Sequence, residues 1–288
     1  MKIALLGSNG QLGQDLRNAL QTHDVRALTR ADFDVTEHDR ARSRITDIAP
    51  DVIINTTAFH RVDDCESQPE LAYAVNALAA LNLVRVANDL DATIIHFSTD
   101  YVFDGSSDRP YDESSPPMPL SVYGNSKLAG EYLIRTLARK PIVIRTCGLY
   151  GAAGSRGKGG NFVEAMLEKA RRGDRIAVVD DQTVTPTYTA DLALQVAALV
   201  ESGGAGLYHA TNDGQCTWYT FARAIFEIAG IPADLNPTTS AQYRAPARRP
   251  RYSVLENARL KVQGLDRMRP WRDALADYLD RRRNRQAP

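Results

Sequence analysis

The sequence predicts an α/β fold built on a doubly wound parallel sheet, with a smaller C-terminal α/β part. Short apolar runs alternate with amphipathic stretches of helical period through roughly residue 200, and this alternation is typical of a parallel sheet with helices on both faces. A glycine-rich turn follows the first apolar run directly, and polar residues follow the later runs. Because open parallel sheets bind ligands beyond the carboxyl ends of their strands, these residues predict a binding edge.

The composition narrows the class of protein. The 288 residues include 35 Lys and Arg and 35 Asp and Glu, so the balanced charge gives no reason to expect nucleic acid or an anionic membrane as a partner. No run of about 18 apolar residues is present, and we expect no membrane-spanning segment. The scattered cysteines indicate reduced thiols in the cytoplasm and predict neither a disulfide framework nor a metal site: Cys65, Cys147 and Cys216.

The first 20 residues carry a dinucleotide fingerprint. Residues 2–6 form an apolar run, a glycine then recurs every third residue from Gly7, and apolar residues follow at helical spacing. Glycines allow the backbone to turn tightly and to approach a pyrophosphate, which the amino end of the next helix attracts. We therefore predict a Rossmann core over residues 1–150, whose cofactor contacts include Gly7, Asn9, Gly10, Gln11, Leu12 and Gly13.

The end of the second strand indicates which cofactor binds. Sites specific for NAD place an acidic residue there, which accepts a hydrogen bond from the ribose 2′-hydroxyl. Here Arg30 follows the apolar run 25–28, and a guanidinium suits the 2′-phosphate of NADPH, although a solvated surface arginine is the alternative. We predict NADPH as the cofactor, with NADH possible, and we place Asp34 and Val35 in the loop beneath the adenine.

The third strand and the long helix after it add further predicted contacts. Residues 51–55 form a buried run, and we expect the residues at and beyond its carboxyl end to join the cofactor site, together with one from the helix: Thr57, Ala58 and Asn76. Polar residues in between indicate either a ligand loop or an ordinary exposed turn: His60, Arg61, Asp63 and Asp64. The helix is predicted over Glu70–Leu90, with an apolar side made of Leu71, Ala74, Leu78, Leu81 and Val84.

A proton-transfer site is predicted between the fourth strand and the next helix. The apolar run 93–97 delivers Ser98 and Thr99 at its carboxyl end, and Tyr123 and Lys127 lie four residues apart, on one face of a helix. A neighbouring ammonium group favours a phenolate and lowers the pKa of a tyrosine, while a hydroxyl at the strand end can hydrogen-bond the same substrate oxygen. Tyr-x-x-x-Lys is also common on helix surfaces. The pattern therefore indicates a proton-transfer site only together with the strands around it.

The second half of the chain contains two segments with two interpretations each. The glycine-rich stretch Gly151–Gly160 is either a gate over a ligand or a linker. The stretch 232–251 holds four arginines, which suit a diphosphate or belong to a solvated loop. We expect residues 151–288 to be mainly a substrate-binding part, with segments around 176–200 returning to the core. The basic run 281–285 fits a frayed helix end better than a binding patch.

Five motifs occur in an order that resembles a known family: GSNGQLG, STDYVFDG, VYGNSKLAGE, DDQTVTPT and ARRP. Over nearly its whole length the chain resembles the extended short-chain dehydrogenases, and most of all the dTDP-4-dehydrorhamnose reductases. The resemblance implies an NADPH-dependent reduction of the C4 ketone of a dTDP-sugar, from dTDP-4-dehydrorhamnose to dTDP-L-rhamnose. It also implies three catalytic residues, with Tyr123 giving the proton and Lys127 holding the ribose: Thr99, Tyr123 and Lys127. Substrate contacts are implied for Tyr101, Phe103, Asn161, Thr187 and Arg249.

Departures from the family pattern keep other functions open. Gly148 stands where relatives carry a tryptophan, and Val184 stands where a glycine is often found, so the sugar stays open. A 4,6-dehydratase would carry Thr-Asp-Glu, whereas this chain has Tyr101 in the third place and lacks one partner for the elimination of water. The alternatives are another nucleotide-sugar reductase or 4-epimerase, or a non-catalytic NADP-binding regulatory subunit like the β-subunit of methionine adenosyltransferase.

The oligomeric state is the last expectation. We expect a monomer or a homodimer. Some relatives dimerise through a divalent metal held by carboxylates, and Asp15 matches one such ligand, but the sequence offers no match for the others. No metal is therefore predicted.

Overall fold

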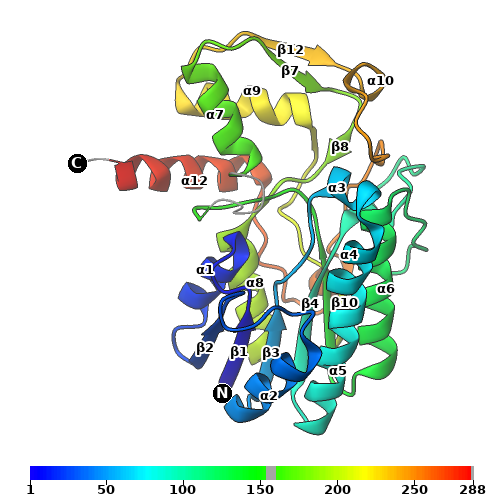
Figure 1. The fold of residues 1–288 in the computed structure, drawn as a ribbon. Helices are drawn as coiled ribbons and strands as arrows, with labels where there is room; N and C mark the ends of the chain where they lie inside the picture. Colours follow the sequence, from blue (N-terminus) through cyan, green and yellow to red (C-terminus); the bar gives the residue numbers. More distant parts are fainter. Residues whose placement is uncertain (154–159, 287–288) are drawn as a thin grey trace.

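Six parallel strands form the central sheet of the molecule (Figure 1). The computed structural model describes residues 1–153 and 160–286. The strands lie in the order β10-β5-β4-β3-β1-β2, and every neighbouring pair is parallel. The prediction of a doubly wound parallel sheet is confirmed. The strand bounds are β1 Lys2–Leu6, β2 Asp24–Leu28, β3 Val52–Asn55, β4 Thr93–Thr99, β5 Pro141–Thr146 and β10 Gly206–His209.

Helices cover both faces of this sheet. Helices α1 and α8 pack over one face, and α2, α5 and α6 pack over the other. Between α2 and α6 the chain also forms two short helices, a π-helical turn η1 and a 3-10 turn η2. The bounds are α1 Gln11–Ala19, α2 His38–Ile48, α3 Val62–Ser67, α4 Pro69–Tyr73, η1 Ala74–Leu78, α5 Ala79–Asp89, η2 Asp100–Val102, α6 Val122–Leu137 and α8 Thr189–Glu201.

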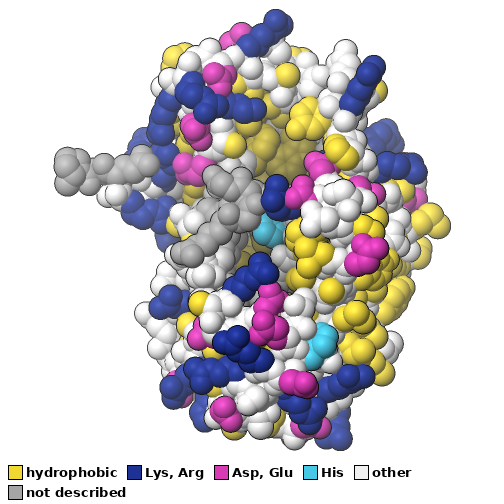
Figure 2. All heavy atoms as spheres, viewed as in Figure 1, with side chains coloured by type: hydrophobic (Ala, Val, Ile, Leu, Met, Phe, Trp, Pro, Cys, Tyr) yellow, Lys and Arg dark blue, Asp and Glu magenta, His cyan; other side chains and the backbone are white. Residues whose placement is uncertain are grey.

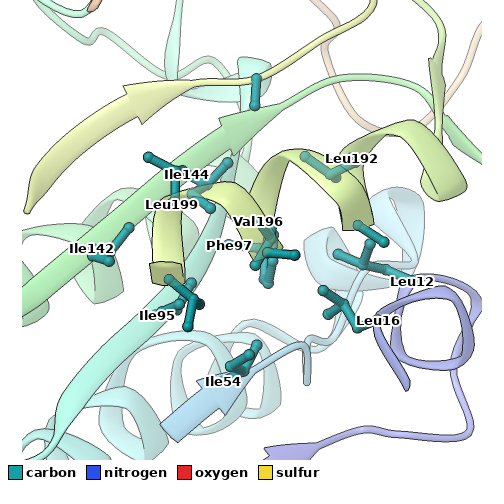
Figure 3. Packing of buried hydrophobic residues seen from close by; sticks show 14 of the residues in the cluster. Leu12, Leu16, Ile54, Ile95, Phe97, Ile142, Ile144, Leu192, Val196 and Leu199 are labelled. Carbon is teal, nitrogen blue, oxygen red and sulfur yellow. The ribbon is translucent and has the colours of Figure 1, made fainter. Parts of the chain in front are cut away.

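Alternate residues of each strand enter opposite cores. In β1, Ile3 and Leu5 join the core under α1 and α8, whereas Ala4 and Leu6 join the core under α2 and α5. Figure 3 shows the first of these cores, in which leucines of α1 and α8 meet isoleucines of the strands. Burial on both faces explains why the strands appear in the sequence as continuous apolar runs.

A second part of the chain stands beyond the carboxyl ends of the strands (Figure 1). Its own core is rich in aromatic rings, with Tyr150 stacked on Tyr188 at 5.6 Å and Tyr278 edge-on to both. Three two-stranded sheets and several helices build it and its junction with the central sheet. The bounds are β6 Leu149–Tyr150, α7 Phe162–Arg171, β7 Ile176–Val179, β8 Thr183–Val184, β9 Thr187–Tyr188, β11 Cys216–Thr217, α9 Trp218–Ala229, β12 Leu235–Thr238, α10 Ser240–Tyr243, α11 Ala258–Val262 and α12 Trp271–Gln286.

The segment expected to return to the core divides between the two parts. Helix α8 packs with α1 in the core of the central sheet, so the carboxyl-terminal half of the 176–200 segment does return to the Rossmann core. Strand β7 instead pairs with β12 in a separate two-stranded sheet, and its residues Ile176 and Val178 lie in the aromatic core. Since β7 pairs outside the central sheet, the expectation for residues 176–200 was too broad.

The long helix after β3 is not a single α-helix. The π-helical turn η1 separates α4 from α5, and such a turn contains one extra residue, which rotates the buried face. The predicted apolar side was therefore wrong at two positions, because Leu71 and Leu78 are 40% and 50% exposed. By length and mean hydropathy this 69–89 stretch could cross a membrane, but half of it is buried and α5 packs on the sheet, as in the core helix of a globular protein.

Candidate active site

The glycine turn joins β1 to α1 at the carboxyl edge of the sheet. Gly7 has a φ of +76°, and a Cβ on Gly13 would lie 2.3 Å from the Gly7 carbonyl oxygen, so neither position accepts another residue without strain. Helix α1 begins after Gly10 without a side-chain cap, which leaves its first N–H groups for a ligand. The buried Gln11 Oε1 has no hydrogen-bond partner among the described residues. A pyrophosphate fits these close-packed glycines and this uncapped helix end.

The end of β2 holds the residues predicted to select the cofactor. The Arg30 side chain is 87% exposed, and its Nη2 lies 2.6 Å from Asp34 Oδ2. Asp34 Oδ1 also accepts hydrogen bonds from the N–H and the hydroxyl of Thr36. Although burial raises the pKa of Asp34, the Thr36 hydrogen bonds and the Arg30 charge bring it below its usual value. Arg30 can therefore turn towards a phosphate, but Asp34 competes for it.

Other predicted cofactor contacts differ in accessibility. Asn9, Thr57 and Ala58 are partly exposed at the carboxyl edge, whereas Leu12 and Val35 are buried. Leu12 and Val35 belong to the hydrophobic cores beneath the site, and their contacts with a cofactor stay a prediction.

Asn76 has a positioning role that differs from the predicted cofactor contact. It lies fully buried in η1, where its Oδ1 accepts a hydrogen bond from the Phe59 N–H at 2.9 Å. Its Nδ2 donates to the Phe59 carbonyl at 3.1 Å and to Ser126 Oγ at 3.0 Å. The hydrogen bonds of the Asn76 amide thus tie the loop after β3 to helix α6. The same loop is fixed at its start by Thr57, whose N–H and hydroxyl donate to Asn55 Oδ1.

Thr99 and Tyr123 meet at the carboxyl end of β4. Thr99 Oγ1 accepts a hydrogen bond from the Tyr101 N–H at 3.2 Å and donates to Asp100 Oδ1 at 3.0 Å. Tyr123 lies in the first turn of α6, which Ser121 caps with its side chain. The Thr99 hydroxyl is close enough to the Tyr123 phenol to lower the pKa of that phenol, and the Tyr101 ring packs edge-on against the Tyr123 ring, with centroids 5.8 Å apart.

Lys127 lies one helical turn beyond Tyr123 and is 3% exposed. Burial lowers the pKa of Lys127 to about 8, and the charge of Glu131 opposes this shift. Glu131 lies a further turn along α6 and forms a bidentate ion pair with Arg145 of β5, with N–O distances of 2.9 and 2.5 Å. Both partners of this pair are at most 1% exposed, so α6 is locked to the sheet directly behind the predicted catalytic residues.

The pKa of Tyr123 does not follow the sequence expectation in the protein alone. We expected Lys127 to lower it. Burial instead raises the pKa of Tyr123 above its ordinary value; the hydrogen bond with Thr99 lowers it, and the Asp100 charge raises it further. The phenol is therefore held in its neutral form, as a proton donor must be.

Arg249 approaches this site from the C-terminal part. Its Nη2 lies 2.9 Å from Asp63 Oδ2, and Asp63 Oδ1 accepts the Ala247 N–H at 3.1 Å. Arg249 also interacts electrostatically with the Tyr101 phenol, which places the guanidinium near the predicted catalytic residues. Figure 2 shows a hollow between the two parts of the molecule, in which hydrophobic side chains are exposed and charged side chains lie at the rim.

Three residues predicted to contact the substrate are buried in other roles. The Phe103 ring is fully buried and stacks on Tyr111 at 4.1 Å. Asn161 caps α7 by accepting the Glu164 N–H at 3.0 Å, and its Nδ2 donates to the Gly151 carbonyl. Thr187 is 0% exposed within the β6–β9 pair. The structure thus gives packing and capping roles to these side chains, and their contacts with the substrate stay a prediction.

Two features of the sequence analysis concern the loop after β5. Gly148 has a φ of +55°, and a Cβ there would lie 3.3 Å from Trp218 Cη2, so an aromatic ring from α9 already packs on this position. Val184 is buried in β8, opposite Cys216. The gate predicted over Gly151–Gly160 falls mostly on residues 154–159, which lie outside the described residues.

Asp15 does not gather metal ligands in the described part of the chain. Thr189 Oγ1 donates to Asp15 Oδ2 at 2.5 Å. Across residues 1–153 and 160–286, no group of three or more His, Cys, Asp or Glu side chains is placed to hold a metal ion.

Sequence reasoning missed two buried carboxylates that support the site, Asp100 and Glu131. The four-residue step from Lys127 to Glu131 was available as a signal, because that spacing puts both on one helix face. Nothing in the sequence indicated that Cys147 would donate to Asp100 Oδ2 at 3.0 Å, since this contact depends on the register between β4 and β5.

Comparison with known proteins gives consistent matches over the whole chain. Residues 1–284 match the family model described as the RmlD substrate binding domain. The chain is 42% identical over 280 residues to dTDP-4-dehydrorhamnose reductase of Streptomyces griseus, and the matched region covers 94% of this chain and 90% of that protein.

Two solved structures are similar to this fold throughout. A dTDP-4-dehydrorhamnose reductase of Clostridium acetobutylicum superposes with a TM-score of 0.94 at 38% identity, covering 98% of this chain and 100% of that one. The dTDP-4-dehydrorhamnose reductase of Bacillus anthracis, solved in complex with NADP, gives a TM-score of 0.93 at 33% identity, covering 97% and 99%.

Proposed function

The chain belongs to the RmlD substrate binding domain family, and on this premise we propose that it reduces the C4 ketone of dTDP-4-dehydrorhamnose with NADPH, which yields dTDP-L-rhamnose. The observation that carries the proposal is the meeting of Thr99 and the neutral Tyr123 phenol at the end of β4, one helical turn from Lys127. A relative named for this reaction is 42% identical over nearly the same length, and the fold matches a relative solved with NADP.

The cofactor is held by backbone at one end and by side chains at the other. The uncapped amino end of α1 and the glycine turn at Gly7 and Gly13 receive the pyrophosphate. Arg30 turns from Asp34 to the 2′-phosphate, which favours NADPH. Bound NADPH supplies the hydride that adds to the C4 carbon.

Tyr123 protonates the C4 oxygen of the sugar. Its phenol is kept neutral by burial, and its place in the first turn of α6 leaves the hydroxyl at the open edge of the sheet. Lys127, whose pKa of about 8 leaves it mostly protonated at neutral pH, holds the nicotinamide ribose. Its charge also stabilises the phenolate that remains after proton transfer.

The nucleotide part of the substrate lies towards the C-terminal segment. Arg249 is the predicted substrate contact whose guanidinium stays near the cleft, because Tyr101 lies beside it and Asp63 holds it. A diphosphate would compete with Asp63 for this guanidinium. Tyr101, edge-on to Tyr123, lines the sugar side of the same space.

The setting of the reaction follows from the same residues. None of the three cysteines forms a disulfide and all three are buried in the described part of the chain, which suits the reducing cytoplasm. We place the enzyme there, acting as a monomer or a homodimer on a soluble dTDP-sugar, without nucleic acid, membrane or metal as a partner.

The test is turnover by the purified protein alone. NADPH oxidation should follow the addition of dTDP-4-dehydrorhamnose, and nuclear magnetic resonance should identify dTDP-L-rhamnose as the product. The UDP-linked 4-keto sugar serves as the control for the nucleotide. A protein that binds NADPH but consumes none with any 4-keto sugar would contradict the proposal and favour the regulatory-subunit alternative.

A further inference from the structure

Asp100 is a buried carboxylate that the proposed reaction does not use. It is 3% exposed, in η2, directly after the strand that delivers Thr99. Its Oδ1 accepts a hydrogen bond from Thr99 Oγ1 and its Oδ2 accepts one from Cys147 Sγ, both at 3.0 Å. Among the described residues no Lys, Arg or His forms an ion pair with it. Burial raises its pKa, and hydrogen bonds are what stabilise its charge.

The Thr99 hydroxyl has a single proton to give. An ionised carboxylate only accepts hydrogen bonds, so the 3.0 Å contact with Asp100 requires Thr99 to be the donor. The Thr99 oxygen already accepts the Tyr101 N–H at 3.2 Å. With its proton held by Asp100, the Thr99 hydroxyl can offer the neighbouring Tyr123 phenol only a lone pair.

We propose that Asp100 is a positioning residue that, by holding the Thr99 hydroxyl proton, keeps the Tyr123 phenol in its protonated, proton-donating form. A phenolate at Tyr123 would face a Thr99 lone pair in place of a donor. The phenolate would also lie near the negative charge of Asp100, which is the residue after Thr99 in the chain. Both effects oppose loss of the phenolic proton, and a reduction needs that proton on the enzyme until hydride arrives. The inference rests on the proposed function for its substrate.

The charged and titratable groups that act on the Tyr123 phenol come from η2, from α3 and from the residue after β5: Asp100, Tyr101, Cys65 and Cys147. Lys127 lies one turn further along the same helix. Burial raises the pKa values of Tyr101 and of the Cys147 thiol, so both are neutral when the enzyme works. Lys127 favours the phenolate, and Asp100 is the anion that opposes it. Burial raises the pKa of Tyr123 in the first place, and a Thr99 hydroxyl turned towards the phenolate would lower it.

The test variant, Asp100→Ala, removes the charge and the acceptor of the Thr99 proton together. Thr99 is then free to donate to the phenolate, so Tyr123 should ionise more readily. Asp100→Asn removes the charge alone, because its amide oxygen still accepts a hydrogen bond. The basic limb of the kcat/KM profile for ketone reduction should in Asp100→Ala move to lower pH by about one unit or more, which is a tenfold change in the ionisation constant. Cys147→Ala is the matched control, because it removes the Cys147 donor to the same carboxylate but leaves the contact between Thr99 and Asp100.

A second readout does not depend on turnover. The ultraviolet absorbance of tyrosinate, taken as the difference between each protein and its Tyr123→Phe counterpart with NADP⁺ bound, reports the ionisation of Tyr123 directly. It should begin at lower pH in Asp100→Ala than in the wild type. Asp100→Asn should give a smaller shift in the same direction, because it removes the charge but keeps an acceptor for Thr99, and it tests the inference should the Ala variant fold poorly.

Two results would overturn the inference: a folded Asp100 variant with an unchanged tyrosinate titration, or an equal shift in Cys147→Ala. A wild type that turns over no 4-keto sugar would contradict the proposed function instead. The absorbance titration would then still decide whether Asp100 controls the phenol.

Discussion

The two parts of the molecule hold their site residues by different means. In the central sheet, Gly7 and Thr99 stand at the carboxyl ends of the parallel strands β1 and β4, and Tyr123 lies in the first turn of α6, which packs on the same sheet, so the topology brings them to one edge. In the C-terminal part, Arg249 is fixed by an ion pair with Asp63, 186 residues earlier in the chain. The chemistry thus follows from short local patterns, whereas the substrate side depends on contacts between distant segments.

The largest effect is expected at the strand edge. Tyr123→Phe keeps the ring and its packing but removes the acid, so kcat should fall by roughly 10²–10⁴-fold, while the dissociation constant of NADPH stays near the wild-type value. Stopped-flow and steady-state kinetics measure both. Tyr101→Phe is the comparison variant, since it removes the neighbouring phenol on the sugar side of the site but keeps the ring that packs edge-on against Tyr123. Near-native turnover by Tyr123→Phe would move the acid elsewhere, with Tyr101 as the first suspect.

The stability of the two parts should differ in the same sense. Glu131→Gln leaves the fully buried Arg145 without its charge partner, and breaking such a pair costs about 3–5 kcal/mol. In the C-terminal part, Asp277→Asn removes one of two carboxylates from the partly exposed Arg269, which should cost less than about 1 kcal/mol. Urea unfolding measures both variants. Equal losses would show that the central sheet is not the more tightly specified part.

The choice between NADPH and NADH tests the role of Arg30, the exposed residue just beyond β2. Arg30→Ala should remove a charge-assisted contact of about 1.5–3 kcal/mol and reduce the preference for NADPH over NADH by roughly ten- to hundredfold. The ratio of kcat/KM for the two cofactors is the measurement. Asp34→Asn is the counterpart: it frees Arg30 from its ion pair and should strengthen the preference. An unchanged ratio in Arg30→Ala would assign Arg30 to the solvated surface.

A smaller effect should appear with pH. Lys127, with a pKa lowered by burial to about 8, is charged below that value and neutral above it. If its charged form holds the ribose, NADPH affinity should weaken above pH 8, by up to about tenfold per pH unit. Because the unfolded chain keeps this proton to higher pH than the folded one, the same group makes folding more favourable as pH rises from about 8. Fluorescence titration of NADPH should show the dependence in the wild type and not in Lys127→Met.

The smallest effect is expected for Asn161, where a variant can distinguish a helix cap from a substrate contact. Asn161→Ala removes the side-chain cap of α7, which typically costs about 1 kcal/mol of stability. Since its amide is already bonded within the protein, KM for the dTDP-sugar should stay unchanged. A several-fold rise in KM at unchanged thermal stability would restore the predicted substrate contact.

Sequence patterns predicted what depends on period and order. The apolar runs and the glycine turn predicted the parallel sheet, and the four-residue step predicted that Tyr123 and Lys127 share a helix face. They could not show that Phe103 turns inward onto Tyr111, because strand alternation breaks down in η2. They also could not show the contact between Asp100 and Cys147, which arises only when β4 and β5 lie side by side.

The π-helical turn η1 has a consequence for how the gene can change. It accommodates one residue more than an α-helical turn would. Loss of a single codon there would let α4 and α5 merge into one regular helix, and the flanking turns would keep their faces, because a π turn holds its extra residue within about one turn of helix. The side chain of Asn76, inside this turn, would be displaced and would no longer tie Phe59 to Ser126. A one-residue deletion that shortens the helix by little more than an ångström would thus detach the loop after β3 from α6.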